Sequence, residues 1–151
     1  EHPLKTLWEK PSRLVIGFMS GTSADGVDAA LVRITGFGTQ TRAEQLGFRF
    51  VPFSDEVRAE ILRLAGGDPA SAADFCRMNF LLGELFCEAG EALCAQTGTK
   101  LSDIDLIGSH GQTFWHIPEK EEYLSRTFAS TFQLGEEAVL AERFGCPVVG
   151  N

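Results

Sequence analysis

Small, hydroxyl-bearing and acidic residues are concentrated in one short stretch, Ser-Gly-Thr-Ser-Ala-Asp-Gly, at residues 20–26. Apolar segments precede and follow it, so it is expected to form a turn between two buried elements. Glycines let backbone amides approach an anion, hydroxyl groups donate hydrogen bonds to it, and a carboxylate can hold a metal ion that bridges phosphates. The candidate phosphate loop consists of Gly21, Thr22, Ser23, Ala24, Asp25, Gly26, Val27 and Asp28.

Two other loop types share part of this pattern but lack residues that they need. Gly21 and Gly26 have the spacing of a P-loop, yet Val27 and Asp28 stand where that motif has Lys and Ser or Thr. The segment Gly-Thr-Ser-Ala-Asp nearly matches the nucleophile elbow G-x-S-x-G, but Asp25 replaces the second glycine. An ordinary hairpin, in which Asp25 and Gly26 serve only the turn, remains open on the spacing alone.

A second polar cluster, Ser-His-Gly-Gln-Thr, occupies residues 109–113. We expect a buried strand from Asp105 to Ser109 that leads into a polar loop at His110. Ligands of such sheets bind beyond the carboxyl ends of the strands, which makes these side chains candidate ligand-binding groups. The alternative is that His110 makes only a structural hydrogen bond. The charged run Glu119 to Glu122 is expected to be a solvated loop.

The hydrophobic pattern predicts which elements position these two clusters. Three strands joined by short turns, which should form an antiparallel meander, are expected at Leu14–Met19, Val27–Ile34 and residues 42–53. Two helices follow, one from the cap Ser54 to Gly66 and a longer one from about Ser71 to Gly98. After the strand at Asp105–Ser109, a strand at Thr131–Leu134, a helix at residues 136–144 and a last strand at residues 146–151 complete the chain. The order β-β-β-α-α-β-β-α-β predicts a mixed sheet flanked by helices.

The composition limits the class of protein. The 151 residues, 44% hydrophobic and 23% charged, are typical of one soluble globular domain, and no apolar run is long enough for a membrane span. Residues 1–12 lack the apolar region of a secretion signal, so a cytoplasmic location is the default expectation. A formal net charge of −8 argues against a nucleic-acid partner, and bound phosphates would need backbone amides and a metal.

The four cysteines predict neither a disulfide framework nor a zinc site. No C-x-x-C pair occurs, and no histidine stands at ligand spacing from a cysteine. We expect reduced thiols buried like small apolar residues, with Cys76, Cys87 and Cys94 on one side of the long helix.

Three blocks of the sequence resemble a known family. The segment GFMSGTSADGVDAALV is similar to the N-terminal signature of the anhydro-N-acetylmuramic acid kinases, which belong to the superfamily of sugar kinases, heat-shock chaperone ATPases and actin. The segments GSHGQTFWH and TFQLGEEAVLAERFGCPVVGN resemble two further blocks of that family, in the same order. Together these blocks span nearly the whole chain from residue 13 onward.

The resemblance implies a fold and a set of site residues. It implies the ribonuclease-H-like, actin-like ATPase half, with residues 13–151 as the N-terminal kinase lobe and residues 1–12 as an extension. It implies that Gly21 to Asp28 wraps the β- and γ-phosphates of ATP, with Asp25 holding Mg²⁺ directly or through water. The sugar cleft would be lined by Ser109, His110, Gly111, Gln112 and Thr113.

The resemblance also implies an activity. Members of the family act on 1,6-anhydro-N-acetylmuramic acid released in peptidoglycan recycling, and water opens the anhydro ring as O6 takes the γ-phosphoryl group. The related levoglucosan kinase shares the signature and uses another anhydrosugar. The expected partners are the anhydrosugar, a C-terminal half and, as an alternative left open, a second copy of the chain.

One part of the family pattern has no counterpart in this sequence. In the family, the segment equivalent to PVVGN continues into Phe-Arg-x-x-Asp, whose aspartate is the proposed base that activates water, whereas this sequence ends at Asn151. No catalytic base is therefore assigned within the chain, and we expect the isolated polypeptide to show no significant turnover. It is either part of a kinase, completed by a continuation or a second chain, or a non-catalytic nucleotide-binding remnant.

Overall fold

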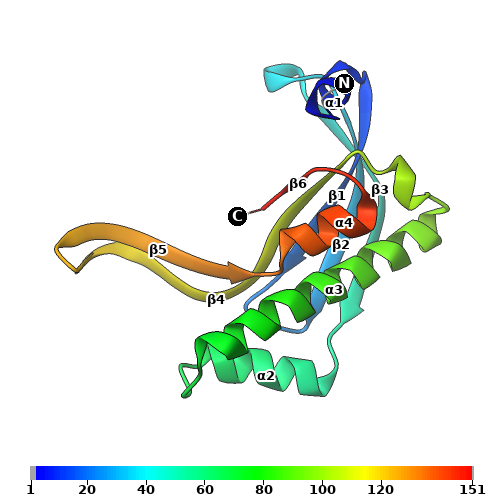
Figure 1. Cartoon of the computed structure of the whole chain (residues 1–151). Coiled ribbons are helices and arrows are strands. Elements are labelled where there is room, and N and C mark those ends of the chain that lie inside the picture. Colours follow the sequence, from blue (N-terminus) through cyan, green and yellow to red (C-terminus); the bar gives the residue numbers. More distant parts are fainter. Residues whose placement is uncertain (1–2, 151) are drawn as a thin grey trace.

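A computed structural model describes residues 3–150 and shows an α/β fold built on one six-stranded mixed sheet. The strands are β1 (Ser12–Ser20), β2 (Gly26–Thr35), β3 (Arg42–Pro52), β4 (Leu106–Tyr123), β5 (Arg126–Leu134) and β6 (Val148–Val149). The helices are α1 (Pro3–Glu9), α2 (Asp55–Ala65), α3 (Ala72–Thr97) and α4 (Glu137–Phe144), shown in Figure 1. The predicted order of strands and helices from β1 to β6 is confirmed.

The sheet combines a meander with parallel strands. β1, β2 and β3 pair antiparallel in sequence order, and β4 then pairs with β1 in parallel. β5 lies antiparallel to β4 on the side away from β1, and the short β6 runs parallel to β4. This topology, with helices flanking the sheet, is consistent with an actin-like ATPase fold.

Two helix starts follow the sequence signals closely. Ser54 caps α2 by accepting a hydrogen bond from the Val57 amide at 3.3 Å. Ser71 and Asp74 form a capping box at the start of α3, in which the Asp74 carboxylate accepts from the Ser71 amide at 2.8 Å. α3 ends at Gly98, whose positive φ of 69° is the left-handed conformation that suits glycine.

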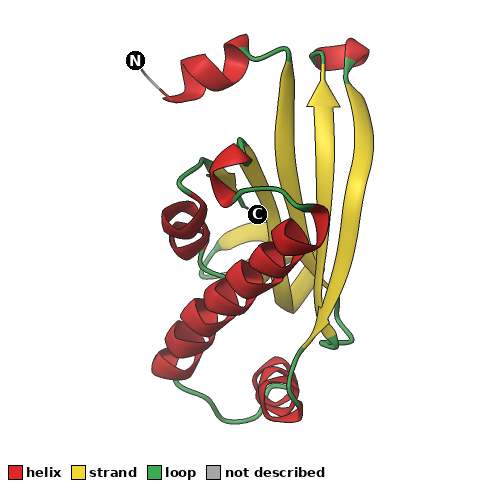
Figure 2. Ribbon diagram, turned by 90° about the vertical axis from the view of Figure 1, so that its right-hand side faces the viewer, coloured by secondary structure: helices red, strands yellow, loops and turns green. Residues whose placement is uncertain are grey.

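The core lies between the sheet and α3, which runs along one face of the sheet in Figure 2. Apolar residues at helical spacing in α3 are buried or partly buried against the rest of the core: Phe75, Met78, Leu82, Leu85, Ala89 and Leu93. Phe86 stacks on Phe18 of β1 with ring centroids 5.9 Å apart. Leu140 and Phe144 join this core from α4. The cysteine prediction is correct for Cys87 and Cys94, but Cys76 is exposed.

The largest departure from the sequence prediction is the length of β4. The predicted loop at His110 and the predicted charged loop at Glu119–Glu122 both belong to this strand, which extends without interruption to Tyr123. β5 correspondingly begins at Arg126 instead of Thr131. The two strands form a hairpin that projects from the body of the molecule (Figure 1). Strand pairing, and not hydrophobic alternation, sets these bounds.

A second departure is the helix α1, which the sequence did not predict. Its Trp8 ring stacks on Phe37 at a centroid separation of 4.7 Å, and the guanidinium of Arg13 lies 4.1 Å from the centre of the Phe37 ring. α1 is therefore held against the turn between β2 and β3. No helix among residues 3–150 is both long and apolar enough to cross a membrane.

Candidate functional site

The candidate phosphate loop joins the end of β1 to the start of β2. The Ala24 amide donates to the Gly21 carbonyl at 3.0 Å, which closes a tight turn. Ala24 has a positive φ of 53° and is 1% exposed, so this side chain anchors the turn in the core. Thr22 and Ser23 are exposed, and within residues 3–150 their hydroxyl groups form no hydrogen bond. The turn thus presents backbone and hydroxyl donors to solvent.

The two glycines of this loop have different surroundings. A Cβ atom on Gly26 would lie 2.3 Å from the Val51 carbonyl oxygen and 2.7 Å from Cα of Pro52. At Gly21 the nearest atom to such a Cβ is Ser23 Oγ, at 3.9 Å. Gly26 is therefore required for packing against β3, whereas Gly21 leaves one side of the loop open to a ligand.

A buried hydrogen-bond bridge connects the loop to the second polar cluster. Ser20 Oγ lies 2.7 Å from the Gly26 carbonyl oxygen and 2.5 Å from Oε1 of Gln112, and its one proton can be donated to either. Gln112 Nε2 donates to the Gly21 carbonyl at 3.1 Å. Ser20 and Gln112 are 0% and 1% exposed. Since buried polar groups are costly without partners, this bridge fixes the loop against β4.

A β-bulge in β4 places Gln112 at this position. Phe18 is paired with Ser109 and Ser20 with Gln112, so one residue of β1 between the pairs faces two residues of β4, His110 and Gly111. Gly111 has a φ of 71°, and a Cβ there would lie 2.7 Å from the Leu134 carbonyl oxygen. Just after the bulge, at Gln112, the pairing of β4 with β1 ends and its pairing with β5 on the opposite edge begins.

The other members of the second cluster have different environments. His110 is exposed, Thr113 is half-buried and Ser109 is 5% exposed. Ser109 Oγ has no hydrogen-bond partner in the described chain. The five residues lie within β4, and Gln112 is the one among them that forms a hydrogen bond with the candidate phosphate loop.

Asp25 lies on the outer side of the loop, where it forms an ion pair. Its Oδ1 accepts from Arg58 Nε of α2 at 3.4 Å, and Arg58 Nη2 donates to the Ser23 carbonyl at 3.3 Å. The Asp25 backbone carbonyl accepts from the Phe53 amide at 2.9 Å. With 57% of its side chain exposed, the carboxylate remains accessible to a cation. Asp28 is half-buried in β2, opposite Met19.

The donor set of the loop fits one kind of metal only. No group of three or more His, Cys, Asp or Glu side chains that could hold a metal occurs within residues 3–150. Mg²⁺ keeps several waters and binds through one or two carboxylates together with substrate phosphates. Asp25 alone could supply such a contact, so these residues fit a magnesium ion delivered with a nucleotide.

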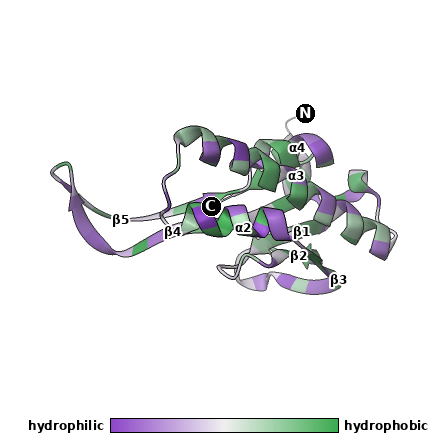
Figure 3. Ribbon diagram, turned by 90° about the horizontal axis from the view of Figure 1, so that it is seen from below, coloured by the Kyte–Doolittle hydropathy of each residue, from purple (hydrophilic) through white to green (hydrophobic). Residues whose placement is uncertain are grey.

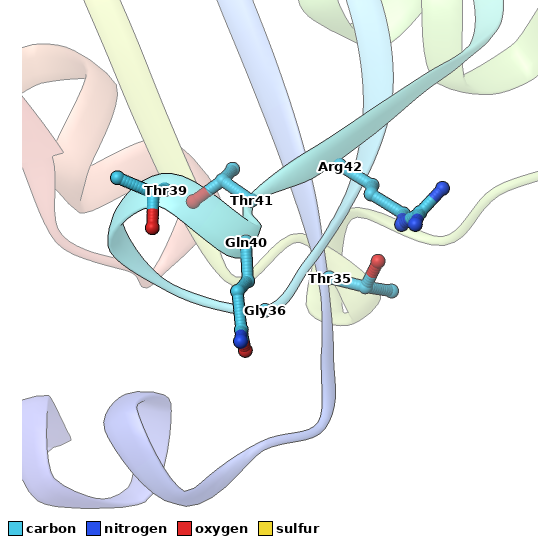
Figure 4. Close-up of a pocket in the computed structure, with 6 residues that line it drawn as sticks. All are labelled: Thr35, Gly36, Thr39, Gln40, Thr41 and Arg42. Atoms are coloured by element: carbon cyan, nitrogen blue, oxygen red, sulfur yellow. The ribbon is translucent and has the colours of Figure 1, made fainter.

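A cavity at the turn between β2 and β3 lies elsewhere. It has a volume of about 690 Å³ and surrounds the turn between β2 and β3, where Thr35, Thr39 and Arg42 are among the lining residues (Figure 4). Thr35 pairs with Ser12, at the opposite end of β1 from the phosphate loop. Because it shares no residue with either polar cluster, we do not assign this cavity to the site.

Two contributors to the site were missed by sequence reasoning. Ser20 follows Ile16 and Phe18 on the buried face of β1, and a hydroxyl at such a position signals a specific partner. Arg58 carried no comparable signal, because its contact with Asp25 depends on where α2 packs.

Comparison with known proteins agrees with these features. Residues 13–151 match the sequence model of the family Anhydro-N-acetylmuramic acid kinase. A protein named anhydro-N-acetylmuramic acid kinase from Caldanaerobacter subterraneus subsp. tengcongensis is 48% identical over 148 residues, 98% of this chain and 37% of the relative. A protein of the same name from Bacillus thuringiensis subsp. konkukian is 39% identical over 137 residues, 91% of this chain and 35% of the relative.

The matched relatives are much longer than this sequence, which spans about a third of their length. The match nevertheless includes the phosphate loop, the bulged segment of β4 and the final helix and strand. The chain belongs to the anhydro-N-acetylmuramic acid kinase family.

Proposed function

We propose that this chain forms the lobe of an anhydrosugar kinase that binds the phosphates of ATP. The observation that carries the proposal is the turn at residues 20–26, which is anchored by Ala24 and by the Ser20–Gln112 bridge while Thr22 and Ser23 face solvent. Rigid backbone amides and hydroxyl groups suit the β- and γ-phosphates of a nucleotide.

The substrate we propose is 1,6-anhydro-N-acetylmuramic acid, after the name of the relatives. In the proposed reaction, water adds to the anomeric carbon, the bond from that carbon to O6 breaks, and O6 takes the γ-phosphoryl group of ATP. The products are the 6-phosphorylated sugar and ADP. This reaction belongs to the recycling of peptidoglycan fragments in the cytoplasm.

In this proposal Asp25 contacts the magnesium ion that accompanies ATP. When bound, that ion neutralises charge on the β- and γ-phosphates. Asp25 then changes partner, since the same carboxylate is paired with Arg58 in the structure. Arg58 in turn remains attached to the loop through the Ser23 carbonyl.

Ser109, His110, Gly111, Gln112 and Thr113 are proposed to line the side of the sugar cleft nearest to the phosphates. Their position next to Ser20 supports this, because the phosphoryl group must pass from the loop to O6 over a short distance. The rest of the sugar site and the base that activates water are proposed to come from the part of the kinase that this sequence does not include.

The proposal is tested by coupled ADP release with Mg²⁺ and ATP in the intact protein that carries this sequence. We expect ADP formation that depends on 1,6-anhydro-N-acetylmuramic acid and proceeds more slowly with levoglucosan. No ADP formation with either sugar, in a folded protein, would leave only a nucleotide-binding role. Faster turnover of levoglucosan would place the protein with the alternative anhydrosugar kinase.

A further inference from the structure

One guanidinium group lies against the candidate phosphate loop. Arg58 Nε donates to Asp25 Oδ1 at 3.4 Å, and Arg58 Nη2 donates to the Ser23 carbonyl oxygen at 3.3 Å. Within residues 3–150, no other hydrogen bond or ion pair of the structure joins a Lys or Arg side chain to residues 21–28. In a chain with a formal net charge of −8, Arg58 therefore supplies the positive side chain that this loop contacts.

The position of Arg58 follows from the packing of α2. Ile61 and Leu64 bury one face of this helix in the core. Figure 3, which views the molecule from below, shows that the helix combines hydrophobic with hydrophilic residues. The Phe53 amide, just before the helix, donates to the Asp25 carbonyl at 2.9 Å and so ties the start of α2 to the loop. Because Arg58 lies in the first turn of α2, its side chain is held beside the loop by a fixed backbone.

The contacts of Arg58 are those of a side chain that can exchange partners. Both distances are longer than the range of about 2.7–3.2 Å that is usual for such hydrogen bonds. The side chains of Arg58 and Asp25 are 46% and 57% exposed, and an exposed ion pair contributes little to stability. Nη1 of Arg58 forms no hydrogen bond within residues 3–150. The guanidinium thus has one free nitrogen and two that are weakly engaged.

We propose that Arg58 binds phosphate oxygens of ATP, which replace Asp25 as its partner. The inference rests on the proposed function, in which Asp25 contacts the magnesium ion. Asp25 then leaves Arg58, whose Nε and Nη1 become available to phosphate while Nη2 keeps its bond to the Ser23 carbonyl. The planar fork of a guanidinium suits phosphate oxygens. Every charge stays paired, since the carboxylate gains the ion and the guanidinium gains a phosphate.

Two simpler roles for Arg58 predict different behaviour. An arginine that only occupies Asp25 competes with the metal ion, so its removal would tighten the binding of nucleotide with Mg²⁺. An arginine that only holds the turn in shape acts in the nucleotide-free protein as well, so its removal would loosen residues 20–28 before any ligand binds. The proposed exchange predicts neither effect, because Arg58 gains a phosphate partner in place of the carboxylate that it loses.

The test is the dissociation constant of a non-hydrolysable ATP analogue with Mg²⁺, measured by isothermal titration calorimetry on the intact protein. Arg58→Gln should raise it by about 10–100-fold, the loss expected for a hydrogen bond between charged groups. Arg58→Lys should recover part of the affinity, because it keeps the charge but not the fork of donors. Arg77→Gln is the matched control, since it removes a guanidinium from another exposed ion pair with an aspartate, Asp74, and should bind like the wild type.

Measurements on the nucleotide-free protein separate binding from a structural role. Arg58→Gln should shift the melting temperature by less than about 2 °C and leave amide exchange at residues 20–28 unchanged. Tighter or equal binding of the analogue by Arg58→Gln would overturn the inference. So would weaker binding accompanied by faster exchange at residues 20–28 in the absence of nucleotide. A wild type that does not bind the analogue would contradict the proposed function itself, and the inference with it.

Discussion

Gly21 and Gly26 show how single residues shape the candidate phosphate loop. Gly26 is packed against the backbone of β3. A Cβ atom added to it would lie only 2.3 Å from the Val51 carbonyl oxygen. A Cβ atom added to Gly21 would lie 3.9 Å from its nearest neighbour, so the space on that side of the loop is open. One glycine thus serves the fold, and the other leaves room for a ligand.

Alanine at these two positions should therefore have different effects on stability. We predict that Gly26→Ala lowers the free energy of unfolding by about 1–3 kcal/mol, because β3 must move to admit the methyl group. Gly21→Ala should change it by less than about 0.5 kcal/mol. Chemical denaturation of both variants measures the difference, and equal losses would contradict the packing described for Gly26.

The Ser20–Gln112 bridge makes a further prediction at the residue scale. Ser20→Ala or Gln112→Ala leaves buried groups without partners and should each cost about 1–3 kcal/mol of unfolding free energy. The double variant should cost less than the sum, with a coupling of about 0.5–3 kcal/mol. Strictly additive losses in a denaturation cycle would show that the two side chains do not act together.

At the scale of elements, the capping box makes α3 sensitive to acid. Hydrogen bonds from the Ser71 backbone and side chain hold the pKa of Asp74 below its ordinary value, with help from Arg77. A carboxylate whose pKa is lower in the folded state stabilises the fold above its unfolded pKa, and this contribution is lost as pH falls through the folded pKa.

Asp74→Ala should therefore lower stability at pH 7, and its difference from wild type should begin to narrow below about pH 4, the ordinary range for aspartate, and close as pH falls through the lower folded pKa. Thermal unfolding of wild type and variant from pH 7 to pH 3 measures the difference in stability between them. Arg77→Ala is the control, since an exposed ion pair contributes little. A gap that is constant from pH 7 to pH 3 would mean that the carboxylate does not cap the helix.

The sequence predicted those elements whose signals are local. The caps Ser54 and Ser71, the apolar positions of α3 and the apolar runs of β1 and β2 are all set by neighbouring residues. The outer half of β4 was missed because Pro118 and the charged run after it are typical of loops. Both faces of that segment are exposed, so no burial pattern could reveal a strand whose order comes from pairing with β5.

The candidate site was predictable to a similar degree. The residues from Gly21 to Asp28 stand out by their types, but their spacing alone left an ordinary hairpin open, and phosphate binding by this loop stays a prediction. The bridge from Ser20 to Gln112 joins residues 92 positions apart, and the bulge at Gly111 follows from a change of neighbouring strand. Such long-range contacts have no signature in a single sequence.

At the scale of the whole molecule, the reactivity of the four free cysteines depends on how the helices pack on the sheet. Burial raises the pKa of Cys87 and of Cys146 to about 11, and it raises the pKa of Cys94 as well. At pH 8 only about a thousandth of a thiol with such a pKa is ionised, and the thiolate is the reactive form.

We predict that a disulfide reagent such as DTNB labels one thiol per folded chain rapidly, at the exposed Cys76, and the other three slowly. Cys76→Ser should abolish the fast phase and leave the slow phase unchanged. In denaturant all thiols should react fast. Rapid labelling of more than one thiol in the native protein would contradict the packing of α3 and α4 against the sheet.

The measurement that tests the central claim most directly is amide hydrogen exchange in the intact protein, with and without Mg²⁺ and a non-hydrolysable ATP analogue. If the turn between β1 and β2 binds the nucleotide phosphates, exchange should slow at residues 20–28 and remain unchanged at residues 35–42, around the cavity at the turn between β2 and β3. Protection at residues 35–42 without protection at residues 20–28 would contradict the assignment of the phosphate loop.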